Sequence, residues 1–229
     1  MVAASKKIVT PLASLLAVTS AAVAAYAFGL PPFERRGDIG ASDVCASLGS
    51  SPRVVPALRG SLPSEPEYHF DDRLSGRDIT SQSSDYTADC LIWGEENLLL
   101  SARTEMMLTS TGASTQADPS EVRSWATAAV DVPESRLASF DAGTEGVTAA
   151  RKAAILVPCA SPGNIPGGTY SLSVVVDLRG HGEDPSENGS RQNLIDLAVS
   201  AARFSHAKAK CDLPSGLPGG DDRRGPATS

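Results

Sequence analysis

Four widely spaced cysteines constrain this chain more than any other feature: Cys45, Cys90, Cys159 and Cys211. No two of them form a C-x-x-C pair, and none has a histidine at metal-ligand spacing, so neither a zinc site nor a thioredoxin-like redox motif is indicated. An even set of dispersed cysteines in an exported protein is typical of structural disulfides. We therefore expect two disulfides, no metal site and no cofactor.

Three pairings of these cysteines are possible. We favour Cys45–Cys90 with Cys159–Cys211, because each bond then lies within its own half of the chain. Each bond would close a loop of about 50 residues, worth about 4 kcal/mol in the chain-entropy model. Two such bonds are comparable to the whole stability of an ordinary domain.

The export argument begins with residues 8–30, which contain no charged side chain. Lys6 and Lys7 precede this stretch, and Pro31 and Pro32 follow it. A helix of this length, rising about 1.5 Å per residue, covers the roughly 30 Å hydrocarbon core of a bilayer. The pattern predicts a transmembrane signal anchor with a cytoplasmic amino terminus.

A cleaved signal peptide is the alternative interpretation. Ala25-Tyr26-Ala27 is a small-x-small site that would permit cleavage before Phe28 and release a secreted protein. No lipobox cysteine follows the apolar stretch, because the first cysteine is Cys45. We expect a single-pass cell-membrane protein whose carboxyl-terminal domain is extracytoplasmic.

The expected organisation of the chain follows from these boundaries. The segments are a cytoplasmic amino terminus (1–7), the anchor (8–30), a linker (31–41), an extracytoplasmic domain (42–213, with 42–130 and 135–213 as two possible packed halves) and a disordered tail (214–229).

Charge excludes one class of partner. The whole chain has a formal net charge of −7, and without its first 30 residues it keeps 18 basic against 27 acidic residues. Such a surface repels phosphate backbones, so we expect no nucleic-acid partner. The expected partners are the membrane, through residues 8–30, and an unknown protein or cell-envelope component.

Hydrophobic periodicity predicts the fold class. Residues 85–108 form two strand-like runs around a turn at 94–97, and residues 169–180 alternate apolar and polar side chains as a half-buried strand does. Residues 118–130 open with Asp-Pro and continue at helical spacing, and residues 191–211 are a longer apolar-striped helix. We expect an α+β fold in which antiparallel β-hairpins pack against helices, preceded by one transmembrane helix.

The order of these features resembles a group of actinobacterial proteins. A cysteine in an early helix, "CLIW" on a strand, then "LVPC" and a terminal helix ending in cysteine are similar to membrane-tethered or secreted proteins of unknown function with two disulfides, including lipoprotein-type domains. The chain differs from the lipoprotein members because it lacks a lipobox. The resemblance implies a fold and a location but no activity.

The densest polar segment begins at Asp177, near the end of the strand at 169–180, and continues into the loop that follows it. Its candidate site residues are Asp177, His181, Glu183 and Asp184, whose spacing does not match a known calcium-binding loop. We interpret them as a solvated surface loop, with His181 as the least unlikely base of a hydrolase.

No other residue indicates catalysis. His69 and His206 occupy ordinary strand and helix positions, and Asp71-Asp72 reads as a solvated pair rather than a glycosidase site. We assign no catalytic residue and expect a non-enzymatic binding or envelope-interaction module. The alternatives are a small extracytoplasmic hydrolase, or a small-ligand-binding protein with an apolar cavity beneath its sheet.

Overall fold

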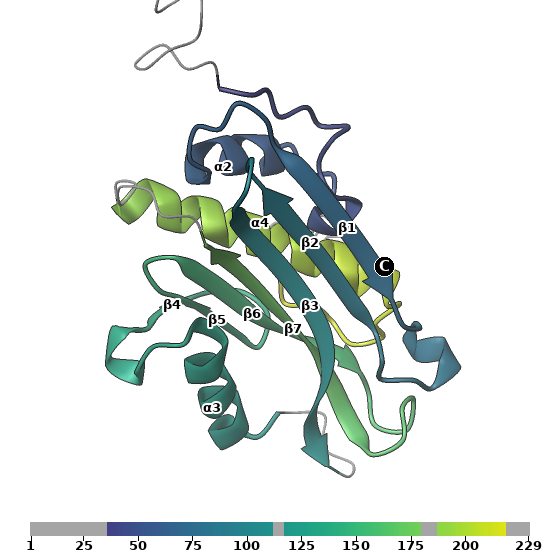
Figure 1. Ribbon diagram of the computed structural model, residues 1–229. Helices are drawn as coiled ribbons and strands as arrows, with labels where there is room; N and C mark the ends of the chain where they lie inside the picture. Colours follow the sequence, from purple (N-terminus) through teal and green to yellow (C-terminus); the bar gives the residue numbers. More distant parts are fainter. Residues whose placement is uncertain (1–35, 112–116, 180–186, 219–229) are drawn as a thin grey trace, which may run out of the picture.

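The computed structural model describes residues 36–111, 117–179 and 187–218, and these form one sheet with helices on both faces (Figure 1). The α+β class expected from the sequence is confirmed. The predicted anchor at 8–30 lies outside the described residues. Within the described ranges, no helix combines the length and the apolar character needed to cross a bilayer.

The sheet has seven antiparallel strands in the order β1-β2-β3-β7-β6-β5-β4. The strands are β1 (His69–Ser75), β2 (Thr87–Trp93), β3 (Leu98–Thr111), β4 (Ala138–Phe140), β5 (Glu145–Thr148), β6 (Lys152–Ala160) and β7 (Gly168–Leu178). The long pairing of β3 with β7 joins the two halves of the chain into one continuous sheet. The expected hairpin at 85–108 corresponds to β2 and β3.

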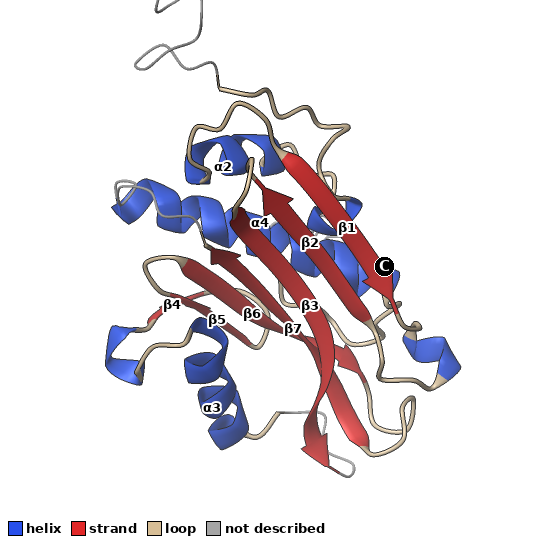
Figure 2. Ribbon diagram, in the orientation of Figure 1, coloured by secondary structure: helices blue, strands red, loops and turns tan. Residues whose placement is uncertain are grey.

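Three α-helices cover the sheet unequally (Figure 2). They are α2 (Val54–Ser61), α3 (Pro119–Val130) and α4 (Glu187–Lys208). The described residues also form three short 3₁₀ helices, which are η1 (Ala46–Leu48), η2 (Ile79–Ser81) and η3 (Glu134–Arg136). On one face α4 packs against β6, β7 and β3, with α2 and η1 beside it. On the other face α3 packs against β5, β6 and β7.

Local sequence explains where α3 begins and ends. Asp118 accepts a hydrogen bond from the backbone N–H of Ser120 at 2.7 Å, and Pro119 occupies the first helical position, where no backbone N–H is needed. Asp131 ends the helix in a left-handed conformation. The side-chain and backbone hydrogen bonds from Ser120 lower the pKa of Asp118, which keeps the cap charged.

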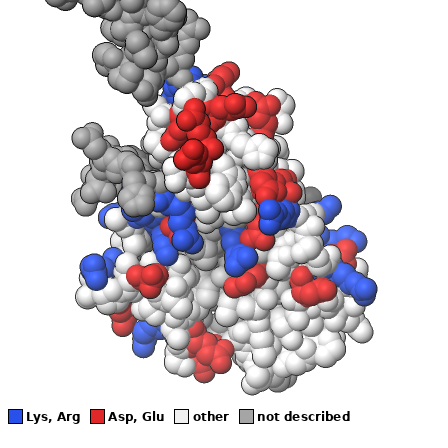
Figure 3. Space-filling model, viewed as in Figure 1, with Lys and Arg blue, Asp and Glu red and all other residues white. Residues whose placement is uncertain are grey.

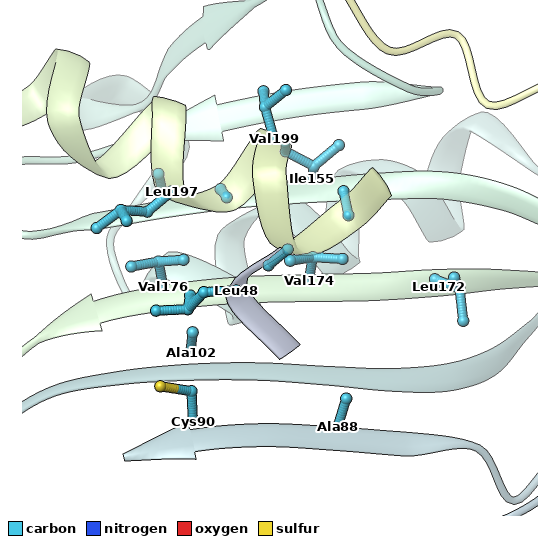
Figure 4. Packing of buried hydrophobic residues seen from close by; sticks show 14 of the residues in the cluster. Leu48, Ala88, Cys90, Ala102, Ile155, Leu172, Val174, Val176, Leu197 and Val199 are labelled. Carbon is cyan, nitrogen blue, oxygen red and sulfur yellow. The ribbon is translucent and has the colours of Figure 1, made fainter. Parts of the chain in front are cut away.

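The main core lies between α4 and the sheet (Figure 4). Leu172, Val174 and Val176 of β7 are fully buried against Leu197 and its neighbours on α4. These are the positions that the alternation in 169–180 assigned to the buried face. Because adjacent side chains of a strand point to opposite faces, the intervening side chains of β7 must point toward α3.

A second, smaller core lies beneath α3. Trp125 and Val130 of α3 pack against Val147 and Leu156 of the sheet. The indole N–H of Trp125 donates a hydrogen bond to the hydroxyl of Ser173 at 2.8 Å. The strand at 169–180 was expected to have one solvated face, but α3 covers that face, so Ser173 is buried.

Both disulfides have the predicted pairing. Cys45 bonds to Cys90, and Cys159 bonds to Cys211, with Cα–Cα distances of 5.9 and 4.4 Å. The first bond joins the start of η1 to β2, and the second joins β6 to the chain just after α4. The covalent framework therefore places one disulfide in each half of the chain.

The expected start of the disordered tail, residue 214, lies too early in the chain. Residues 211–218, which we call the C-terminal strap, pack back onto the domain, and Leu217 is buried in the main core. The carboxylate of Asp212 accepts hydrogen bonds from the backbone N–H of Ser161 at 3.0 Å and from Asn164 at 2.8 Å. Leu217 is the apolar residue that attaches the C-terminal strap to the core, and the Pro and Gly residues around it give no sequence pattern that would predict its burial. The tail from 219 onward lies outside the described residues.

Candidate functional site

Among the described residues, no helix lies over one half of the α3-side surface of the sheet. We define the open face as the side chains of β1, β2 and β3 that point away from α4. These are His69, Asp71, Arg73, Ser75, Thr87, Asp89, Leu91, Trp93, Ser101, Arg103 and Glu105. Acidic and basic side chains lie close together across this view of the molecule (Figure 3).

The strand register places charged residues of opposite sign next to one another. Arg73 is opposite Asp89 on β2, and Asp89 is in turn opposite Arg103 on β3. The Nε of Arg103 donates to Asp89 Oδ1 at 2.9 Å. Arg73 holds Asp71 with two donors, its Nε at 3.2 Å and its Nη2 at 2.5 Å. The result is two neighbouring ion pairs, one within β1 and one between β2 and β3, which we call the ion-pair ladder.

The ladder presents its arginines outward. The side chains of Arg73 and Arg103 are 66% and 68% exposed, whereas those of Asp71 and Asp89 are 30% and 23% exposed. Hydrogen bonds to Asp71, and then its charge, raise the pKa of Arg73, and Asp89 acts in the same way on Arg103. Each guanidinium is therefore held in position by a less exposed carboxylate, and its remaining N–H donors stay open to solvent.

Two half-buried apolar side chains complete the open face. Leu91 is opposite Asp71, and Trp93 is opposite His69. Neither belongs to the two buried cores or to the residues packed against them. This surface could not be predicted from the sequence because it depends on the register of β2 against β1 and β3, which no local pattern encodes.

The structure divides the predicted polar loop. Asp177 lies in β7 and is buried, with its side chain only 8% exposed. Its carboxylate is 2.8 Å from Nε of Arg179 and 3.5 Å from Nζ of Lys152. The interpretation of Asp177 as a solvated loop residue is wrong, because β6 and β7 enclose it between two cations. His181, Glu183 and Asp184 lie outside the described residues.

His206 has a structural contact. Its Nε2 is 2.9 Å from the carbonyl oxygen of Leu213, so it ties α4 to the C-terminal strap. Burial lowers the pKa of His206, which favours the neutral ring that donates to this carbonyl. His69 is an exposed residue at the start of β1, on the open face.

The adjacent aspartates point to opposite faces. Asp71 belongs to the open face, whereas Asp72 faces the α4 side and binds η1 through the backbone N–H of Ala46 at 2.8 Å. Asp78 binds Lys210 at 2.9 Å. Two carboxylates on opposite faces of one strand cannot flank the same glycosidic bond, so this geometry gives glycosidase chemistry no support.

Neither similarity to known proteins nor the arrangement of potential metal ligands assigns a function to this chain. No family model, no curated protein and no solved structure matches this chain. In the part of the chain that the structure describes, no group of three or more His, Cys, Asp or Glu residues is arranged to hold a metal ion.

Proposed function

We propose that this chain is a membrane-anchored extracytoplasmic binding module that docks a protein partner on its open face. The observation that carries the proposal is the outward presentation of Arg73 and Arg103 on the same open face as the half-buried Trp93. Tryptophan and arginine are the residue types that most often dominate the energy of protein interfaces.

The composition of the open face fits a protein interface better than an ordinary solvated surface. Its three strands expose arginine rather than lysine, and lysine is depleted at interfaces while arginine is enriched. Oriented guanidiniums lose less conformational entropy on binding than free surface cations do. These properties favour a partner with carboxylates around an apolar contact.

The area of the open face is smaller than the area that a stable protein interface buries. Three strands of about seven residues cover roughly 14 by 23 Å, or about 300 Å². A stable interface usually buries about 800 Å² on each partner. The open face would therefore be the energetic centre of the interface, with neighbouring loops as its rim.

Location remains part of the proposal. The uncharged segment 8–30 supports an anchor, and the two formed disulfides support an oxidising compartment. Cleavage after Ala27 would instead release the domain, with the same open face.

The base expected for the hydrolase alternative, His181, lies outside the described residues. Among the described residues, neither His69 nor His206 forms a hydrogen bond with a hydroxyl or a carboxylate, which nucleophilic catalysis requires of its base.

One observation favours the small-ligand alternative. A cavity of about 510 Å³ lies beside α4, between Phe140 at the end of β4 and Arg53 just before α2. On its wall the buried Nε of Arg203 has no hydrogen-bond partner. Its volume is within the usual range of ligand sites. The test is an NMR screen of a fragment library against the wild type and Arg203→Lys. If neither protein bound any fragment, this alternative would be excluded.

The test of the proposed function is quantitative recovery of partners from the native host. The tagged full-length protein is cross-linked at the cell surface with a membrane-impermeant reagent, and partners are measured by mass spectrometry. We expect one protein to be recovered with wild type, and to decrease at least about tenfold with Trp93→Ala/Arg103→Gln.

The matched control is Ala207→Gln, which alters an exposed position of α4 on the opposite side of the sheet. This variant should recover the partner as wild type does. Equal recovery with all three proteins would contradict docking on the open face, whatever partners were found.

A further inference from the structure

The outer edge of β1 is a long strand edge without a partner. In the described residues β1 pairs only with β2 and has seven residues, whereas β4 at the opposite edge of the sheet has three. No other described segment forms a backbone hydrogen bond with β1. An unpaired edge presents a row of N–H and C=O groups that another strand can bind.

This edge also carries an exposed apolar side chain. Leu74 is 46% exposed, one of two large apolar residues that are exposed in the described part of the chain. It lies on the α4 side of β1, opposite Ala88 of β2, and Phe70 lies on the same side near the other end of the strand.

We propose that β1 pairs with β1 of a second copy of this chain, antiparallel, about a twofold axis at Asp72. In that register Asp71 lies opposite Arg73 of the second copy, and Arg73 lies opposite its Asp71. On the α4 side, Phe70 lies opposite Leu74 of the second copy. The edge is therefore complementary to itself in both charge and apolar character.

The alternative registers lack this complementarity. Because the hydrogen-bonding pattern of an antiparallel pair repeats every two residues, the register can shift only in steps that keep this alternation. One such shift places Arg73 opposite Arg73, and the shift in the other direction places Asp71 opposite Asp71. Like charges directly opposite each other oppose pairing. The register about Asp72 also has one such pair, Asp72 with Asp72 of the second copy, but it alone adds two Asp71–Arg73 pairs, so it is the favoured register.

The groups near the axis are compatible with this arrangement. The carboxylate of Asp72 already accepts hydrogen bonds from the backbone N–H of Ala46 at 2.8 Å and from the hydroxyl of Ser47 at 2.5 Å. These donors draw it toward η1 and offset its charge. Arg73 uses Nε and Nη2 for Asp71 of its own chain, and its Nη1 stays available for the second copy.

Charged residues on an edge strand often prevent pairing, and a row of lysines does so because every contact is repulsive. The edge of β1 differs because Asp71 and Arg73 have opposite signs and are placed symmetrically about Asp72. A strand of seven residues joined in this way would extend the sheet and place two open faces side by side.

The first experiment uses the full chain with a photo-crosslinking amino acid in place of Leu74. Its matched control has the same amino acid in place of Leu108, the other exposed large apolar residue, at 40% exposure. We expect irradiation to give a chain–chain adduct for position 74, with the cross-linked peptide containing Phe70, and none for position 108. An adduct with a different protein, no adduct, or equal adducts at both positions would overturn the proposal.

A charge exchange tests the register. Asp71→Arg in the position-74 protein should lower the adduct yield at least about fivefold, because two attractive contacts become repulsive. Asp71→Arg/Arg73→Asp should restore it to within about twofold, because the opposite charges face each other again. If the exchanged protein shows the unchanged near-UV circular dichroism of a folded domain but no adduct, the proposed register is wrong. Since the readout is a chain–chain adduct, it is independent of the protein partner proposed for the open face.

Discussion

The two halves of the α3-side surface of the sheet begin from similar strand patterns and end in different environments. On β7 the side chains of Ser171, Ser173 and Asp177 are buried, and the hydroxyl of Ser173 accepts the indole N–H of Trp125. On β3 Arg103 and Glu105 occupy the same face and are exposed.

The difference lies in the polar side chains of the two strands. Asp177, near the end of β7, is buried with Lys152 and Arg179 as ion-pair partners, whereas Ser171 and Ser173 carry short hydroxyls. Short hydroxyls permit close packing of α3 and can each be satisfied by one hydrogen bond, whereas a helix over Arg103 and Asp89 would have to desolvate an ion pair. The comparison teaches that alternation alone does not distinguish a solvated strand face from one covered by a helix.

The largest expected difference in stability is between substitutions of the two tryptophans, Trp125 on the covered half of the sheet surface and Trp93 on the open face. Trp125→Ala removes a buried indole and leaves Ser173 without its partner, so we expect a loss of about 3–5 kcal/mol in the free energy of unfolding. Trp93→Ala on the open face should cost less than about 1 kcal/mol. Urea denaturation of both variants provides the measurement, and similar losses would contradict the division of the surface into a covered and an open half.

The next effect concerns the disulfides. Replacing Cys45 and Cys90 by alanine, or Cys159 and Cys211 by alanine, should each lower the free energy of unfolding by about 2–4 kcal/mol. The two losses should be similar because the bonds close loops of similar length, with sequence separations of 45 and 52. Urea midpoints that fall strongly for one pair only would show that the two halves do not depend equally on their bonds.

A smaller effect depends on pH. The lowered pKa of His206 means that the unfolded chain takes up a proton near pH 6.5 while the native chain resists it. The free energy of unfolding should therefore be unaffected by this residue above about pH 6.5 and should fall as the pH decreases toward the lowered native value. Urea midpoints at pH 8, 7, 6 and 5 measure the slope.

His206→Gln should flatten that slope. If His206→Gln kept the full slope between pH 7 and 5, the contact of His206 with the C-terminal strap would not account for the pH dependence.

The smallest expected effect on stability belongs to the ion-pair ladder. Arg103→Gln or Asp89→Asn should change the free energy of unfolding by less than about 1 kcal/mol, because Arg103 is largely exposed and solvent screens the pair. The same Arg103→Gln change should weaken partner binding. A loss of stability well above 1 kcal/mol by urea denaturation would mean that the ladder serves the fold rather than a partner.

Much of the fold could be predicted where periodicity is strong. The hairpin of β2 and β3, the strand β7, the helix α4 and the cysteine pairing all follow from local patterns or from loop closure. The short strands β4 and β5 were missed because three or four residues are too few to show a period of two. The docking of Leu217 was also missed, since a single leucine among Pro and Gly has no periodicity.

The candidate site could not be predicted in the same way. Asp89 and Arg103 are far apart in sequence, and their contact depends on the register of β2 and β3. The burial of Asp177 depends on the pairing of β7 with β6. Side chains that meet through strand order are visible only once the sheet is assembled.

The most direct test of the central claim is hydroxyl-radical footprinting of the two tryptophans, in intact cells of the native host and in the purified full chain. Trp125 serves as the internal reference, since α3 buries it in both samples. The account predicts that Trp93 is oxidised readily in the purified protein and is protected at least about fivefold in cells, where a partner excludes solvent from the open face. Equal oxidation of Trp93 in both samples, with Trp125 unchanged, would show that the open face is unoccupied and would contradict the account.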